Sequence, residues 1–229
     1  MRVAIPMRRR VLWLALAAVA LLVLLPLRLL IEVAPLPDGL GVRRVSGPIW
    51  AGRLAETRWH GAALGDLDAS LAPLPLLVGR IRLQLSGDES DGALTAWPGG
   101  RGIDDFTGTV PADALFEGVP VTSLTLSEAT VHFDDGRCSH AEGRVSIALA
   151  PLASQQPAPL AGTLRCEAGA LLASLTGATG LERLELRVRG NGSWQARLTI
   201  GRGGDGAALA GMGFAPSGSG VVLERSGRF

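Results

Sequence analysis

The chain has 229 residues, which is room for one ordinary domain together with a membrane anchor. Its formal net charge is +1, and all 22 of its basic residues are arginine. Residues 38–229 hold 17 arginines against 20 acidic residues, a net charge of −3. A net-acidic domain with dispersed arginines argues against nucleic-acid binding, which relies on clustered positive charge.

The N-terminus predicts a single membrane anchor. Arg8, Arg9 and Arg10 precede an uncharged apolar run from Val11 to Leu27, and the apolar span extends to Ile31. As a helix, residues 11–31 would measure roughly 31 Å, about the thickness of a bilayer core. A cleaved signal peptide is the alternative, but no convincing small-x-small cleavage site follows the run. The positive-inside rule places the three arginines in the cytoplasm.

We therefore expect four segments along the chain. Residues 1–10 form a basic cytoplasmic segment and residues 11–31 form the anchor. Residues 32–44, which are rich in proline and glycine, form a linker. Residues 45–229 form a β-domain on the far side of the membrane.

The stretch VSGPIWAGRL (45–54) opens this domain and places Trp50 between Gly47 and Gly52. No nucleophile, acid or base stands beside the tryptophan in a catalytic arrangement. We interpret Trp50 and Trp59 as core aromatics that fasten the start of the sheet, with a binding hot spot as the alternative. The glycines suit a bulge or a tight turn.

Alternating apolar and polar residues then predict strands with one buried and one wet face. Asn191-Gly192 lies between two of these segments and is a hairpin signal. The alternating segments are RIRLQLS (80–86), GRVSIAL (143–149), RLELRVRG (183–190) and SWQARLTIG (193–201), which carries Trp194.

Helical signals are short and occur at residues 71–79, 111–119 and 168–177. None is long enough to alternate with the strands as parallel β-α-β units require. The fold class is therefore mainly β: an antiparallel, strongly curved sheet, forming a groove or a partly closed barrel, with one or two short helices.

The chain has two cysteines, Cys138 and Cys166, both in the part expected to face an oxidising compartment. A disulfide between them would close a loop of about thirty residues and contribute roughly 3–4 kcal/mol. A metal site is the alternative, because His140 follows Cys138 by two residues. Too few further ligands accompany this pair for an ordinary zinc site, so we prefer the disulfide.

No constellation for catalysis stands out. The three histidines have no nucleophile motif around them. The acidic pairs Asp104-Asp105 and Asp134-Asp135 lie close to glycines, and we interpret both as turn residues. We expect no enzyme, no cofactor and no metal.

Taken in order, these motifs resemble the type II secretion system protein N family, also called general secretion pathway protein N, over nearly the whole chain. The blocks are VSGPIWAGRL, LAPLPLLVGRIRLQL, CSHAEGRVSIAL, LAGTLRCEAGAL and GSWQARLTI. One departure is in GRVSIAL, where the family often has a tryptophan and this chain has Ile147 or Ala148. The matching positions are Gly47, Ile49, Trp50, Gly52, Leu76, Leu77, Gly79, Cys138, Gly143, Leu164, Cys166, Gly169 and Trp194.

The resemblance implies an accessory subunit of the inner membrane that faces the periplasm and contacts other type II secretion subunits, without a cofactor. A second hypothesis is an AsmA-like β-groove that binds lipid or acyl chains. The two differ in structure: a partner-binding subunit should fill its apolar face with its own side chains, whereas a lipid carrier should leave an apolar trough open.

Overall fold

The computed structural model describes residues 13, 25–29, 39–151, 158–201, 206–218 and 220–229. The expected cytoplasmic segment and most of the expected anchor lie outside these residues. None of the helices in the described part is both long and apolar enough to span a bilayer.

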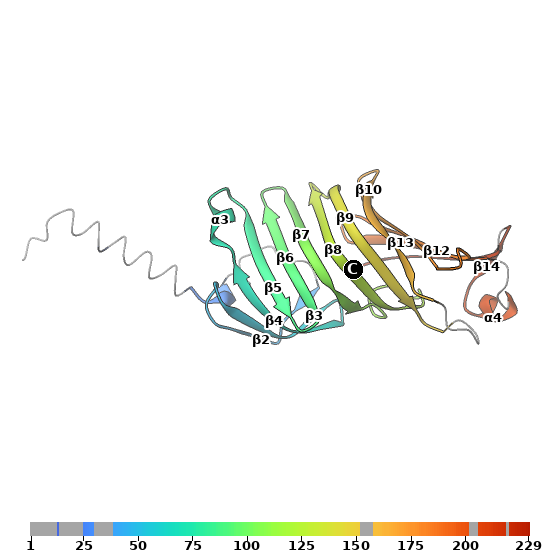
Figure 1. Ribbon diagram of the computed structural model, residues 1–229, viewed down its shortest axis with the longest axis horizontal. Helices are drawn as coiled ribbons and strands as arrows, with labels where there is room; N and C mark the ends of the chain where they lie inside the picture. Colours follow the sequence, from blue (N-terminus) through green and yellow to red (C-terminus); the bar gives the residue numbers. More distant parts are fainter. Residues whose placement is uncertain (1–12, 14–24, 30–38, 152–157, 202–205, 219) are drawn as a thin grey trace, which may run out of the picture.

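The described residues form one large sheet in which each strand pairs antiparallel with its neighbour (Figure 1). The order along the sheet is β1-β3-β4 and onward in sequence to β13, then β15 and β14, and β2 pairs with β3 off this path. The strands are β1 (Leu40–Gly41), β2 (Arg44–Ser46), β3 (Gly52–Trp59), β4 (Ala62–Leu71), β5 (Ile81–Gly87), β6 (Ser90–Trp97), β7 (Gly100–Pro111), β8 (Val121–Asp134), β9 (Arg137–Leu149), β10 (Leu160–Glu167), β11 (Ala170–Thr176), β12 (Glu182–Val188), β13 (Ser193–Gly201), β14 (Ala215–Ser217) and β15 (Gly220–Arg228).

The predicted class, mainly antiparallel β, is confirmed. The first and last strands do not pair, so the sheet stays open and no barrel closes. All four alternating segments form strands, and Gly192 adopts a φ of +81° in the predicted hairpin between β12 and β13. The sheet begins at Leu40, inside the segment expected to be a linker.

The helix predictions had mixed outcomes. Residues 73–76 form the short helix α3 (Pro73–Leu76), as expected for that region. Residue 111 ends β7, and residues 112–119 form successive turns closed by i→i−3 backbone bonds, such as that from the Leu115 N–H to the Ala112 oxygen at 3.2 Å. Residues 170–176 form β11, because pairing with β10 and β12 on both sides outweighs the local helical pattern. A further short helix, α4 (Gly206–Gly211), was not expected.

Register shifts interrupt several of the strand pairs, and three of them place an acidic residue at positive φ. These residues are Glu56 (51°) in β3, Asp105 (52°) in β7 and Glu128 (52°) in β8. The prediction that Asp104-Asp105 form a turn was therefore wrong, since the pair lies inside β7. Bulges bend a strand and increase its twist, which accounts for part of the curvature of the sheet.

The concave inner face of the sheet carries the core in two clusters. The main cluster lies over β7–β15 and includes Val145, Ile147, Leu184, Leu198 and Leu223. The N-terminal cluster lies over β3–β5 and contains Leu27, Ile49, Leu54, Leu67, Ala69, Leu71 and Leu83. Leu64 packs against both clusters and so joins them.

The sheet curls far enough for its two ends to touch through side chains. The ring of Trp59, at the end of β3, lies 5.5 Å from the ring of Phe229 at the C-terminus. Phe116, in the turns between β7 and β8, packs edge-on against Trp194 at 5.5 Å and lies 5.6 Å from Phe229. These aromatic side chains occupy the space that the curled sheet encloses.

Candidate functional site

The end of the apolar run, at Leu25 and Leu27, folds back onto the start of the sheet. The Leu27 N–H donates to the Gly47 oxygen at 3.1 Å, and the Ile49 N–H donates to the Leu25 oxygen at 2.9 Å. Leu27 is fully buried in the N-terminal cluster. Leu25 and Leu27 are thus part of the folded domain.

The two glycines of VSGPIWAGRL have different roles. Gly47 has a φ of +84°, and a Cβ there would lie 2.7 Å from the Ala51 oxygen, so it is a turn residue. Gly52 begins β3 without a positive φ, and neither the expected turn nor a bulge forms there. A Cβ on Gly52 would lie within 2.4 Å of Leu27 Cδ2, so its missing side chain makes room for Leu27.

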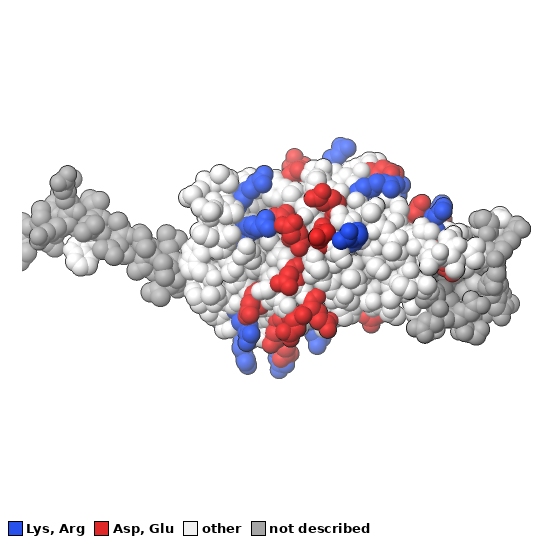
Figure 2. Space-filling view, in the orientation of Figure 1, with Lys and Arg blue, Asp and Glu red and all other residues white. Residues whose placement is uncertain are grey.

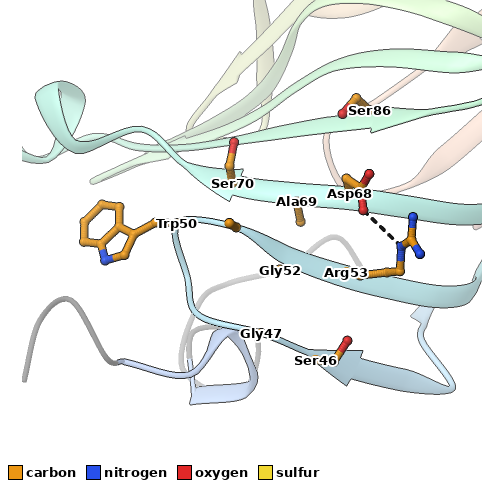
Figure 3. Close-up of a pocket in the computed structure, with 10 residues that line it drawn as sticks. Ser46, Gly47, Trp50, Gly52, Arg53, Asp68, Ala69, Ser70 and Ser86 are labelled. Carbon is orange, nitrogen blue, oxygen red and sulfur yellow. Dashed lines mark hydrogen bonds and ion pairs between the residues drawn. The ribbon is translucent and has the colours of Figure 1, made fainter.

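Trp50 is less buried than its position in the motif predicts. Ile49 is 3% exposed and takes the core position, while Trp50 is half-buried and packs against the margin of the N-terminal cluster. Figure 3 shows its indole ring directed away from the neighbouring strands.

Trp50 borders a shallow groove of about 400 Å³ on the outer face of β2–β5 (Figure 3). Arg53 Nε donates to Asp68 Oδ1 at 3.1 Å across its floor, and both side chains are largely exposed. An exposed pair of this kind contributes little to stability. The remaining polar lining is Ser46, Ser70 and Ser86, which provides hydrogen-bonding groups but no catalytic arrangement.

A second polar group lies on the outer face at the middle of the sheet. Asp104 accepts hydrogen bonds from Arg82 on β5 and from His132 Nε2 on β8, the latter at 2.6 Å. Its side chain is only 14% exposed, so the neighbouring cation and imidazole compensate for its desolvation.

Trp97 lies beside this group. Its indole N–H donates to Asp134 at 2.8 Å, and its ring meets the His132 ring edge-on at 5.2 Å. Hydrogen bonds hold the pKa of Asp134 below its usual value; the bond from Ser139 has the largest effect and the bond from Trp97 the next largest. Asp134 and Asp135 close the β8–β9 turn, as predicted.

Figure 2 shows acidic side chains gathered in a band across the middle of one face, with arginines mostly on either side. Within the described part of the chain, no three His, Cys, Asp or Glu side chains are grouped so that they could hold a metal ion. The outer face is therefore a polar surface of ion pairs, suited to contact with another macromolecule.

The disulfide between Cys138 and Cys166 is confirmed, with the two Cα atoms 5.5 Å apart. It joins the start of β9 to the end of β10, and the Cys138 N–H donates to the Gly169 oxygen at 2.8 Å. The β8–β9 and β10–β11 turns are thereby held side by side.

The remaining residues singled out from the sequence are scattered over the domain. Trp194 is 2% exposed in the main cluster, and Trp59 is half-buried beside Phe229. Gly79 has a φ of +71° in the turn after α3.

The sequence did not reveal the roles of Leu27, Phe116 and Phe229. A signal for Phe116 was present, because the buried residues 112, 115, 116 and 119 follow an i, i+3, i+4, i+7 pattern.

Comparison with known proteins agrees with these features. Residues 38–222 match the family model for the type II secretion system protein N, which covers the whole sheet up to β15. The chain belongs to this family. This agrees with the resemblance that the order of the motifs indicated.

A curated relative is the type II secretion system protein N of Vibrio cholerae serotype O1, 27% identical over 154 residues. The matched region covers 61% of this chain and 61% of the relative. No solved structure matches the chain.

Proposed function

We propose that the protein is an inner-membrane subunit of the type II secretion system that supports the export of folded proteins through protein–protein contacts in the periplasm. A single anchor within residues 11–31 would hold it, with Arg8–Arg10 in the cytoplasm. The basic residues before the apolar run support this orientation. The disulfide supports an oxidising compartment for the domain.

The observation that carries the proposal is the way the chain fills its own inner face. Phe116 is 4% exposed, although it lies in a connection between two strands, and it packs against Trp194 and Phe229. A carrier of acyl chains would need this enclosed space for its ligand. Its occupation by the chain's own aromatic rings favours a contact subunit over a lipid-binding groove.

The outer face is the surface left for partners. Ion pairs join its neighbouring strands, for example Arg197 on β13 with Glu224 on β15 at 2.6 Å. Mixed charge in a fixed arrangement favours selectivity for a complementary protein surface. No catalytic role is proposed.

Site-specific photocrosslinking in the bacterial cell tests the proposal. A photoreactive amino acid would replace Gln84 on β5 or Gln195 on β13, both exposed on the outer face. We expect light-dependent adducts with other secretion subunits, identified by mass spectrometry, and none without irradiation. Adducts with phospholipid alone at both positions would contradict the proposal.

A further inference from the structure

The turn that contains α3 exposes a compact group of large apolar side chains. Leu74, Leu77 and Val78 are 76%, 82% and 76% exposed, and Leu76 is 38% exposed. The segment Ala72–Gly79 contains no charged residue. Contiguous exposed apolar residues of this size are uncommon on a soluble surface and mark a contact with a protein or a membrane.

The backbone holds these side chains outward in a defined turn. The N–H groups of Leu77, Val78 and Gly79 each donate to the oxygen three residues earlier, at 3.1 Å. The Arg80 N–H closes the turn by donating to the Pro75 oxygen at 3.0 Å. The apolar tip is therefore built into the fold, and its exposure does not arise from fraying.

The tip lies beside the place where the apolar run reaches the domain. Ile49 connects the two: its N–H donates to the Leu25 oxygen at 2.9 Å, and its oxygen accepts from the Leu71 N–H at 2.8 Å. Leu71 ends β4, and α3 begins two residues later at Pro73. Figure 1 shows α3 and β2 at the same end of the sheet, opposite α4.

The end of the apolar run is held at this end of the domain. Leu25 and Leu27 form backbone hydrogen bonds with the connection between β2 and β3, and Leu27 is fully buried. The proposed anchor therefore places this end of the domain at the membrane surface.

Arg80 adds a cation at the base of the tip. Its guanidinium lies 5.3 Å from the centre of the Trp97 ring, and the side chain is exposed. An arginine next to an apolar turn fits the boundary between anionic headgroups and acyl chains.

We propose that the α3 turn is a second membrane contact, in which Leu74, Leu77 and Val78 insert into the periplasmic headgroup boundary beside the anchor. The inference rests on the proposed membrane anchoring. With two attachment points, the sheet would be held at a fixed tilt relative to the bilayer. The protruding shape of the turn favours a lipid surface over a protein partner, because a protein would have to provide a matching pocket.

The test uses the full chain in vesicles of phosphatidylethanolamine and phosphatidylglycerol. The disulfide leaves no free thiol among the described residues, so Leu77→Cys adds a single site for an environment-sensitive fluorophore. Met212→Cys is the matched control, because Met212 is an exposed apolar residue in the turn after α4, at the opposite end. Some vesicles carry lipids with a nitroxide quencher near the headgroup.

We expect a blue-shifted emission and a loss of fluorescence to nitroxide lipids for the label at position 77, and neither for the label at position 212. Equal, weak quenching at both positions in protein that resists alkaline extraction would overturn the second contact and leave the anchoring intact. Release of the protein by alkaline extraction would overturn the anchoring and this inference together. A blue shift of the label at position 77 that appears only after secretion subunits are added would assign the tip to a protein partner and overturn the lipid contact.

Discussion

Leu27 lies directly over Gly52, so that a Cβ on the glycine would come within 2.4 Å of Leu27 Cδ2. This contact joins the end of the apolar run to the first long strand of the sheet. Residues 25–29 and the sheet therefore form one folded unit.

Removing the Leu27 side chain should destabilise the domain. Leu27 is fully buried, so we expect Leu27→Ala to lower the free energy of unfolding by about 2–5 kcal/mol. Urea unfolding of the purified protein measures the change. Leu29→Ala is the control: Leu29 is 46% exposed, and its loss should change stability by no more than about 0.5 kcal/mol. Equal effects of the two variants would show that Leu27 does not pack as described.

The tryptophans should differ in their contribution to stability. Trp194 is 2% exposed and packs against Phe116, so Trp194→Ala should cost about 3–5 kcal/mol. Trp50 is half-buried, so Trp50→Ala should cost clearly less. Thermal and urea unfolding of both variants would check the order. A Trp50→Ala variant that unfolds as easily as Trp194→Ala would restore Trp50 to the core role predicted from the sequence.

Loss of the disulfide should weaken the domain by a predictable amount. The two cysteines are separated by 28 positions, and closing a loop of this length contributes about 3–4 kcal/mol in the chain-entropy model. We expect dithiothreitol to lower the urea midpoint of the natural protein. A chain with both Cys138→Ser and Cys166→Ser should start at the lower midpoint and not respond to dithiothreitol. A response in that variant would point to an effect of the reductant elsewhere.

Glu167 should make part of the stability depend on pH. Hydrogen bonds from Arg165 and then from Arg187 hold the pKa of Glu167 below its usual value of 4.5. A lowered folded-state pKa gives stability that is present above pH 4.5 and is lost as the pH falls through the folded pKa. Glu167→Gln should therefore be less stable than the natural protein at pH 7, and the difference should disappear in acid.

Urea titrations at several pH values would follow this difference. Glu117→Gln is the matched control, because Glu117 is exposed in the β7–β8 connection. A difference between the natural protein and Glu167→Gln that grows as the pH falls would contradict the described pairing.

Asp104 and Asp105 offer a direct comparison of two adjacent carboxylates. Asp104→Asn would weaken the pairing with Arg82 and His132 at a largely buried position, and we expect a loss of about 1–3 kcal/mol. The Asp105 side chain is 80% exposed, so Asp105→Asn should be nearly neutral. Urea unfolding measures both. A larger loss for Asp105→Asn would contradict the assignment of Asp104 as the centre of this polar group.

Strands could be predicted from the sequence where one face is apolar and the other is polar. Leu184 and Leu186 alternate with Arg183 and Glu185, and each apolar member is buried as period-2 reasoning requires. Residues 170–176 were misjudged because β11 is apolar on both faces, and a short apolar run does not distinguish helix from strand.

The site features that the sequence did not reveal depend on contacts between distant segments. Phe116 becomes buried only because the curled sheet brings Trp194 and Phe229 to it. Gly52 accommodates Leu27 from a segment 25 positions earlier, and no local pattern predicts such an approach. The sequence predicts a turn at Asp105 where the structure has a bulge, because local preference at an acidic pair does not show whether a strand continues on both sides.

The most direct test of the central claim is the composition of the complex that surrounds the protein in its own membrane. The natural protein would be crosslinked in cells and purified, and its bound proteins and phospholipids would be quantified by mass spectrometry. A subunit whose inner face is filled by Phe116, Trp194 and Phe229 should bring other type II secretion components and no tightly bound lipid within the domain. Stoichiometric phospholipid without any secretion component would contradict this account.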